Sequence, residues 1–494
     1  MIIKSSVKYP IIFMSGYLAV QSFLLYNLVL YATTPIAQGG LGEDPHWANA
    51  IYAVAWSLQS IIAIFLIKWF SKWGYKEGLI VSMVFQTAGF LFLAIPSTTF
   101  FLIGACCWGA GAALSVSQNY VVLSDTMTPE HPGRSNIFLL LYAIMNAAAF
   151  IAGIISGFST QIGFSNVFLI SAALALLILL FLLFIYNKNV EAIEGSDCYD
   201  QNMRKKSVKF AGLIKLFGVG IGTTIFMVLC CYIAEIVNMV IAISVVCIFI
   251  YLFFLVFTHK GDERTKILTF TILMLLTLIF WAGYNLYTAT GFVSILDTAT
   301  NRLGMGVQDY LAIDAGTIIV VGLPLAFWLI ALEKKGIHFN AAMRVIIGMV
   351  LLSIGFLVPV IGFHVAGFEK MDGSFMMLAI FFCGLGEICV GPVGSALAGH
   401  CCTKKLAGVF MAFTFVIVSG SAAISTYWAD WMIDSKSTAI TDITHQFSLT
   451  TGAFSILAII CAIIVLILYK PLVKWGHFTK FKEKEEVPQI DGSK

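Results

Sequence analysis

Long apolar runs separated by short polar stretches are the dominant pattern of the chain. The runs typically reach about 20 residues, which is the length a helix needs to cross ~30 Å of hydrocarbon. Strands of a membrane barrel need only about 10 residues of alternating character, so the pattern predicts helices. The predicted fold class is an all-α integral membrane protein. Fourteen spans are predicted, at 11–36, 46–67, 78–96, 99–124, 136–158, 163–186, 209–232, 236–257, 266–292, 308–332, 343–365, 374–399, 406–428 and 449–470.

The distribution of lysine and arginine tests this count, because cytoplasmic loops are enriched in both. With a cytoplasmic N-terminus, 26 of the 29 basic residues fall in loops or ends on the cytoplasmic side. The three exceptions are Arg302, Lys370 and Lys436. A miscount by one span would reverse the alternation everywhere downstream. Both termini are therefore predicted to be cytoplasmic, in what we expect to be a bacterial inner membrane.

A polar stretch after Tyr186 divides the spans into six, an inserted hairpin of two, and six more. Two six-helix halves facing each other across a central cavity are the architecture of the major facilitator class, whose substrates bind near the midplane. The predicted parts are an N-terminal half at 1–186, a cytoplasmic linker at 187–208, the inserted hairpin at 209–257, a C-terminal half at 258–475 and a cytoplasmic tail at 476–494.

Composition supports the membrane assignment and narrows the chemistry. The chain is 60% hydrophobic and 11% charged, against roughly 45–50% and 25% in soluble proteins. It contains no G-x-S-x-G, H-E-x-x-H or P-loop, and its adjacent cysteine pairs lack metal-ligand spacing. We therefore expect no enzyme activity, no cofactor, no metal and no nucleic-acid partner. In the fourth span, Gly104, Gly109 and Gly111 are predicted to serve close helix packing.

One carboxylate stands inside an apolar span beside a helix-breaking pair. Glu387 lies in the twelfth span, four residues before Gly391. An ionised group at the bilayer centre costs at least ~2.5 kcal/mol, so such groups usually face a cavity or a partner. Irregular backbone at this depth is tolerated only against protein or a cavity. We predict that Glu387 sits at a substrate or proton site, and that Gly391 and Pro392 break the helix where it projects.

Three segments carry motif-like residues. They are Gly386-Glu387-Ile388-Cys389-Val390-Gly391-Pro392-Val393-Gly394, Phe280-Trp281-Ala282-Gly283-Tyr284-Asn285, and Tyr142 with Asn146. The first resembles the G-E-L-x-x-S-P-x-G of the proton-dependent oligopeptide transporter family, and the second is similar to that family's F-W-x-x-[FY]-[DE]-Q. The third falls where the family has a Tyr and an Asn in its fifth helix. The layout of six, two and six spans is also that of the bacterial members.

The chain departs from this family at its charged positions. The family's first-helix E-x-x-E-R, a further arginine in that helix and a fourth-helix lysine are replaced, as the resemblance aligns them, by Met14, Tyr17, Leu18, Leu25 and Leu114. Acids and bases are lost together, as removal of whole ion pairs would require. Glu387 remains, and Asp314 appears in the tenth span. The cavity is therefore predicted to be net negative, a poor host for a carboxylate and a good host for an ammonium group.

The resemblance implies a secondary transporter that takes up di- or tripeptides or amino acids with protons by alternating access. Its partners would be this small-molecule substrate, protons and the lipid bilayer. Without a cation beside it, Glu387 would favour its neutral form and could exchange a proton during the cycle. Because the coupling motif is missing, an uncoupled facilitator or an exporter of drugs or polyamines stays open as the alternative. The candidates for substrate binding or proton coupling are Glu387, Asp314, Asn285, Trp281, Tyr284, Tyr142 and Asn146.

Overall fold

The computed structural model describes residues 5–43, 45–116, 119–120, 134–157, 159–186, 209–286, 295–296, 299–305, 307–333, 335, 339–401, 406–432, 439–476 and 478. Most of these residues form helices. The first 186 residues contain α1 (Ser5–Thr33), η1 (Ile36–Gln38), α2 (Pro45–Trp73), α3 (Tyr75–Leu93), α4 (Thr98–Ala113), α6 (Arg134–Gly157), α7 (Ser159–Ile162), α8 (Phe164–Phe181) and η2 (Leu182–Tyr186).

The inserted hairpin consists of α10 (Phe210–Cys231) and α11 (Ala234–Thr258). The rest of the chain forms α12 (Gly261–Asn285), β1 (Thr300–Asn301), α14 (Val307–Thr317), η4 (Ile318–Gly322), α15 (Leu323–Glu333), α16 (Ala341–Val365), β2 (Met371–Asp372), α17 (Gly373–Val390), α18 (Val393–Cys401), α19 (Ala407–Met432), α20 (Ile440–Ile467) and α21 (Tyr469–Trp475).

The helices are those of an integral membrane protein. Among the described residues, nine helices are long and apolar enough to cross a membrane, and five shorter apolar helices lie within the other predicted spans. The all-α membrane fold is confirmed, whereas the count of fourteen spans stays a prediction. Large apolar side chains such as Leu177, Phe257 and Ile467 are more than half exposed, as lipid-facing side chains would be.

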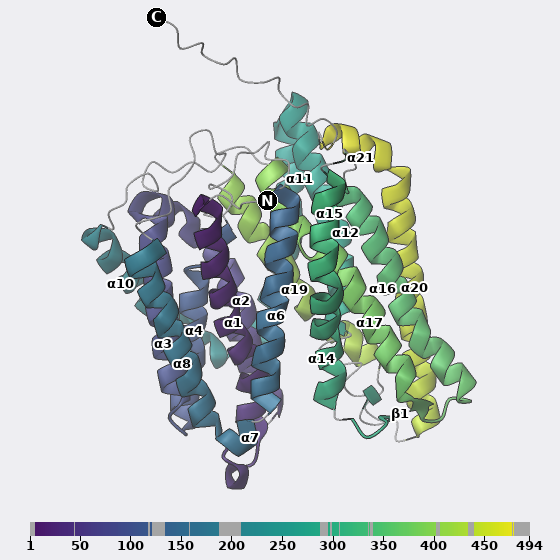
Figure 1. Ribbon diagram of the computed structural model, residues 1–494, viewed down its shortest axis with the longest axis horizontal. Coiled ribbons are helices and arrows are strands. Elements are labelled where there is room, and N and C mark those ends of the chain that lie inside the picture. Colours follow the sequence, from purple (N-terminus) through teal and green to yellow (C-terminus); the bar gives the residue numbers. More distant parts are fainter. Residues whose placement is uncertain are drawn as a thin grey trace, which may run out of the picture.

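Two groups of helices lie side by side. The helices before residue 187, the N-terminal group, lie on one side, and those after residue 260, the C-terminal group, lie on the other (Figure 1). The groups meet along two seams. In one seam α2 packs against α19, and in the other α6 packs against α14, η4, α15, α17 and α18. The residue boundaries predicted for the two halves stay a prediction.

Small residues allow close helix contacts within and around the N-terminal group. Gly89 of α3 faces Gly104 of α4, and a Cβ on either would lie 2.8 Å from the other's carbonyl oxygen. Gly109 leaves room for the side chain of Met227 in α10, and Gly111 lies close to the backbone of α3. A larger side chain at any of these positions would force the helices apart. The packing role predicted for the three glycines of the fourth span is confirmed.

Serine pairs hold helices together at two further places. Ser60 of α2 and Ser419 of α19 lie 3.0 Å apart, oxygen to oxygen, in the first seam. Within the C-terminal group, Ser353 of α16 and Ser455 of α20 each donate to the other's backbone carbonyl oxygen, both at 2.9 Å. In a bilayer, where water is absent, such hydroxyl bonds stabilise helix pairs.

The inserted hairpin touches both groups. Helix α10 packs against α2, α3 and α4, whereas α11 packs against α2 and also against α12 and α19. The backbone N–H of Lys209 donates to Oε1 of Glu77 in α3 at 2.7 Å, which ties the start of α10 to the N-terminal group. A Cβ on Gly420 of α19 would lie 2.2 Å from Cγ2 of Val245 in α11, so the glycine makes room for that valine.

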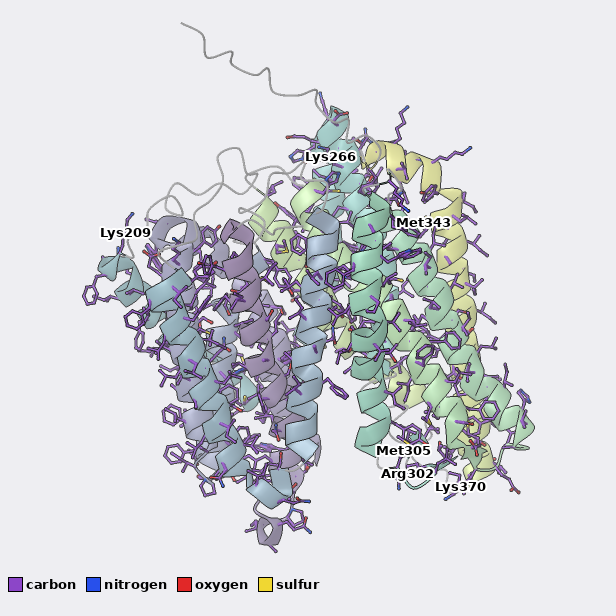
Figure 2. All side chains as sticks on the ribbon, viewed as in Figure 1. Lys209, Lys266, Arg302, Met305, Met343 and Lys370 are labelled. Atoms are coloured by element: carbon purple, nitrogen blue, oxygen red, sulfur yellow. The ribbon has the colours of Figure 1, made fainter. Side chains whose placement is uncertain are left out.

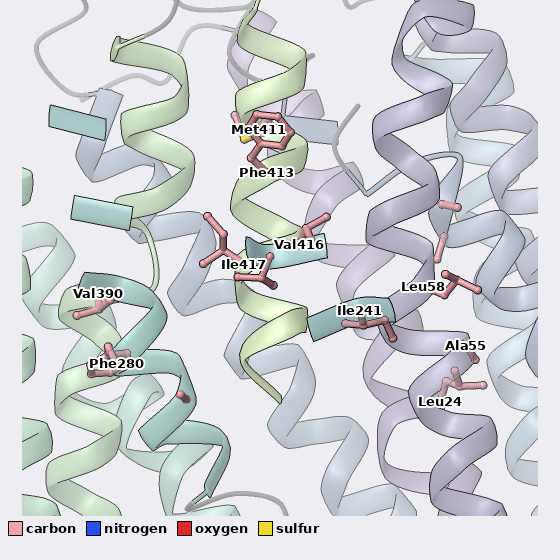
Figure 3. Close-up of a cluster of buried hydrophobic side chains, with 14 of the residues drawn as sticks. Leu24, Ala55, Leu58, Ile241, Phe280, Val390, Met411, Phe413, Val416 and Ile417 are labelled. Atoms are coloured by element: carbon pink, nitrogen blue, oxygen red, sulfur yellow. The ribbon is translucent and has the colours of Figure 1, made fainter. Parts of the chain in front are cut away.

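Apolar side chains fill the space around α11. Figure 3 shows Ile241 of α11 between Ile417 of α19 and Leu58 of α2. All three side chains are buried. The hairpin therefore adds a third surface through which the two groups are joined.

The two ends of the molecule differ in the residues they carry. Lys209 and Lys266 lie at one end, and Arg302 and Lys370 lie at the other (Figure 2). This is the separation that the predicted alternation of loops requires. At the end with Arg302, β1 pairs with β2 in parallel, and Thr300 is opposite Met371. Asp372 caps the start of α17 there, and the hydrogen bonds that its carboxylate accepts from Ser374 hold the pKa of that group below its ordinary value.

Candidate functional site

The twelfth predicted span is two helices rather than one. Helix α17 ends at Val390 and α18 begins at Val393, with Gly391 and Pro392 between them. Pro392 has no N–H to continue the helical hydrogen bonds, so the helix is interrupted there. The last bond of α17 runs from the N–H of Gly391 to the carbonyl oxygen of Glu387, at 2.7 Å. The Glu387 side chain thus projects from the last turn before the break.

The tenth predicted span is also irregular next to its carboxylate. The α14 helix carries Asp314 and passes into the wider π-type turn η4 before α15 begins at Leu323. Pro324 cannot donate to the carbonyl one turn earlier, which accounts for the wider turn. Single π-type turns inside helices are frequent at functional sites.

The structure brings Asp314 and Glu387 together. Helix α14 packs against α17, and a Cβ on Gly384 would lie 2.7 Å from Oδ1 of Asp314. Gly384 and Glu387 are three residues apart, so they share one face of α17. The absence of a side chain at position 384 therefore makes room for Asp314 beside Glu387. The two carboxyl groups act electrostatically on each other.

Each carboxyl group is held by a tyrosine. The Tyr142 hydroxyl, from α6 in the N-terminal group, donates to Oε1 of Glu387. The Tyr284 hydroxyl, from α12, donates to Oδ2 of Asp314 at 2.5 Å. The second oxygens, Oε2 of Glu387 and Oδ1 of Asp314, are buried and have no hydrogen-bond partner among the described residues. The two carboxyl groups lie within hydrogen-bonding reach of each other, so one shared proton would join them.

Burial makes this arrangement costly unless a proton or a cation joins it. Glu387 is 5% exposed and Asp314 is 8% exposed. The described groups that act most strongly on Glu387 are Asp314 and the hydroxyls of Tyr142 and Tyr284, and none of these is a cation. Two buried carboxylates this close repel each other when both are ionised. An ammonium group or a shared proton is the chemistry that such a site accepts.

The other candidates lie around this cluster with different contacts. Trp281 packs edge-on against Tyr284, with ring centroids 5.3 Å apart, and so supports the tyrosine that holds Asp314. Asn285 donates to the Ser421 hydroxyl of α19 at 2.8 Å. Asn146 donates to the backbone carbonyl of Tyr142 at 3.0 Å, one turn back in its own helix. The described bonds of Asn285 and Asn146 thus do not reach the two carboxyl groups.

A second polar cluster lies in the N-terminal group; of its members, the sequence indicated only Gln21, as a weaker candidate for ligand contact than the residues named above. Its centre is the Tyr17 hydroxyl, which accepts hydrogen bonds from the Gln21 amide and, at 2.7 Å, from the Ser115 hydroxyl. Gln86 of α3 lies next to the same hydroxyl. Tyr17 stands where the resemblance expects a charged residue, and Gln21 is one helical turn further on. Two polar residues at helical spacing inside an apolar span are the signal that would have found this cluster.

Two groups of helices that lie side by side, with buried polar clusters near the contacts between them, are the arrangement of the major facilitator fold. No protein-family model matches the chain. The chain is 22% identical over 414 residues to dipeptide and tripeptide permease B of Salmonella typhimurium, covering 81% of this chain and 82% of the permease.

Solved structures show the same fold. A crystal structure of the peptide transporter POT in complex with sulfate is 18% identical, with a TM-score of 0.71, over 95% of both chains. A structure that addresses substrate recognition in proton dependent oligopeptide transporters is 14% identical, with a TM-score of 0.69, over 95% of this chain and 99% of that one. The resemblance inferred from the motifs is confirmed in sequence and in fold.

Proposed function

We propose that the protein is a secondary active transporter that takes up small amine-bearing solutes, di- or tripeptides or amino acids, together with protons. The carboxyl pair of Glu387 and Asp314, held by Tyr142 and Tyr284, is the observation that carries the proposal. The permease and peptide transporters that the chain resembles support the substrate class. Similarity to permeases also agrees with the absence of enzyme activity expected from the sequence.

The carboxyl pair supplies a mechanism that needs no first-helix charge network. When the pair holds a proton, it is less negative and the buried repulsion is relieved. The other carboxyl group of the pair keeps its charge and attracts the ammonium group of a substrate. Because the pair offers two carboxyl groups, it can hold a proton and an ammonium group at the same time, and both are then carried inward together.

The bond from Tyr142 to Glu387 joins the two groups of helices. Alternating access requires the groups to move relative to each other around the bound solute. Tyr142 lies on α6, whereas Glu387, Asp314 and Tyr284 all lie in the C-terminal group. A change of charge at Glu387 alters this one bond across the seam, and this links the occupancy of the site to the movement.

Orientation and location follow from the positive-inside rule. We infer that both termini are cytoplasmic, that the membrane is the bacterial inner membrane, and that the two transporting halves are 1–186 and 258–475. Trp281, Asn285 and Asn146 act in this scheme by shaping the walls around the two tyrosines. Gly391 and Pro392 provide the flexible point next to Glu387.

Uptake by proteoliposomes tests the proposal. Labelled dialanine is expected to accumulate when an inward pH gradient is imposed, and to accumulate less when an ionophore dissipates the gradient. A rate that is indifferent to the gradient would remove the coupling. Efflux driven by the same gradient would favour the exporter.

A matched pair of glutamate variants tests the site. Glu387→Gln removes the charge at the carboxyl pair and is expected to abolish gradient-driven accumulation. Glu77→Gln is the control, because Glu77 is equally buried, at 5% exposed, and glutamine still accepts the bond from Lys209. Normal accumulation by Glu387→Gln would exclude Glu387 as the anchor, whatever the control does.

A further inference from the structure

Among the described residues, the cluster around Tyr17 consists of neutral hydrogen-bonding groups. Tyr17 is 2% exposed, and its hydroxyl accepts hydrogen bonds from Gln21 and Ser115, with Gln86 beside it. Neighbouring helices supply these groups, since Tyr17 and Gln21 lie on α1, Gln86 lies on α3, and Ser115 follows α4. A cluster that draws on neighbouring helices is a fixed feature of the packed N-terminal group.

Asn119 extends this cluster with unused hydrogen-bonding capacity. Its backbone N–H donates to the carbonyl of Ser115 at 3.0 Å, so the two side chains are one helical turn apart on the same face. The Asn119 side chain is 2% exposed, yet neither its Oδ1 nor its Nδ2 has a hydrogen-bond partner among the described residues. Buried amides are nearly always bonded, so an unbonded one needs an explanation such as a ligand.

Tyr120, which directly follows Asn119, lies between this cluster and the helix that carries Tyr142. Its ring packs against Phe415 of α19 in the C-terminal group, with centroids 4.9 Å apart. Its ring also stacks on Phe138 of α6, with centroids 6.3 Å apart, and Phe138 lies one helical turn before Tyr142. Polar residues therefore run from Tyr17 and Asn119 through Tyr120 to Tyr142 and Glu387, from one group of helices to the other.

We infer that the substrate site has two unlike ends and selects amines whose other end is uncharged. The acidic end, Glu387 with Asp314, takes the ammonium group. The neutral end, Tyr17, Gln21, Ser115 and Asn119, takes an amide or hydroxyl group. The inference rests on the proposed function and names its substrate class.

The selection follows from what buried groups can satisfy. An amide both donates and accepts, as the free oxygen and nitrogen of Asn119 require. An ionised carboxylate at the same place would be buried without a positive partner among the described groups around Tyr17, and an unpaired buried charge is unfavourable. A free dipeptide is therefore a poorer substrate than the same dipeptide with an amide at its C-terminus.

A matched ligand pair tests the selection. Binding of alanylalanine and of alanylalaninamide is measured by thermal shift on the detergent-purified protein. In detergent there is no membrane potential, which would otherwise favour the positively charged amide. We expect the amide to bind at least tenfold more tightly than the free acid. Equal affinities, or tighter binding of the acid, would overturn the inference.

Two variants locate the effect at the neutral end. Gln21→Lys supplies a positive charge beside Tyr17 and is expected to lower the preference for the amide at least tenfold. Ser115→Ala removes one bond to Tyr17 and should weaken amide binding, whereas Ser353→Ala, which removes a buried hydroxyl between α16 and α20, should not. A preference unchanged in Gln21→Lys, or equal effects of the two serine variants, contradicts the inference.

Failure of the inference can be told from failure of the proposed function. If both ligands accumulate under a pH gradient without preference, only the neutral end is wrong. If neither ligand binds or accumulates, the proposed function is wrong as well.

Discussion

Gly391 makes room for the tyrosine that joins the two groups of helices. A Cβ at this position would lie 2.4 Å from the Cζ atom of Tyr142. The backbone of Gly391 is right-handed helical, so alanine is excluded by the Tyr142 ring rather than by its own conformation. The residue is thus needed for contact and not for chain flexibility alone.

Gly391→Ala is expected to displace the Tyr142 ring and to lower gradient-driven uptake at least tenfold. Gly218→Ala in α10 is the control, because a Cβ there meets nothing within 4 Å. In a helix, alanine is favoured over glycine by about 1 kcal/mol, so the control should melt at the same or a higher temperature and transport normally. Wild-type uptake by Gly391→Ala would show that the contact is not needed.

Removing the hydroxyl group from Tyr142 should change the kinetics of uptake in a different way from removing it from Tyr284. A hydrogen bond to a charged group contributes about 1.5–3 kcal/mol, or roughly a 10- to 100-fold change. Tyr142→Phe breaks a bond between groups that move, so we expect mainly a lower maximal rate of uptake. Tyr284→Phe breaks a bond within one group, so we expect mainly a higher KM. Initial rates over a range of substrate concentrations separate the two effects, and the same kinetic change in both variants would contradict the distinction.

At the scale of elements, helix irregularities place the carboxyl pair. Pro392 ends α17 just beyond Glu387, and Pro324 follows the wide turn η4 just beyond Asp314. Two interrupted helices that pack against each other thus carry the two carboxylates. Regular helices at both places would leave no freed backbone groups and no local flexibility beside the site.

The contact of α11 with α19 is a further element that a substitution can test. In Gly420→Ala the new methyl group would meet Val245, whose branched side chain has little freedom to move. We expect a lower melting temperature for Gly420→Ala and its recovery in the double variant Gly420→Ala, Val245→Ala. A double variant no more stable than the single one would mean that the two residues do not oppose each other.

At the scale of the whole molecule, the charged ends predict the orientation in the membrane. Lys370 is exposed at the end that carries Arg302. Lys260 is also exposed, and it comes six residues before Lys266, which lies at the opposite end. In intact cells, Lys370→Cys should react with a membrane-impermeant maleimide, whereas Lys260→Cys should react only after permeabilisation. The measured quantity is the labelling of each variant above that of the protein without the introduced cysteine. The reverse pattern would invert the proposed topology.

The sequence by itself determined the membrane class and the helical fold, and it singled out one member of the carboxyl pair. Apolar runs of span length have few stable alternatives in a bilayer, because every backbone group must be bonded within its own segment. Glu387 stood out for the same reason, since a carboxylate in such a run needs a purpose. The motif around Gly391 and Pro392 then indicated the family that the chain resembles.

Tertiary structure decided which polar residues meet. Asp314 lies 73 residues before Glu387 and Tyr142 lies 245 residues before it, and no local pattern states that all three converge. Asn146 and Asn285 fitted the motif equally well but make their described bonds elsewhere. The neutral cluster around Tyr17 is assembled from three separate segments, so it exists only once the helices pack. Side-chain chemistry is local in sequence, whereas the site depends on long-range contacts that only the folded chain creates.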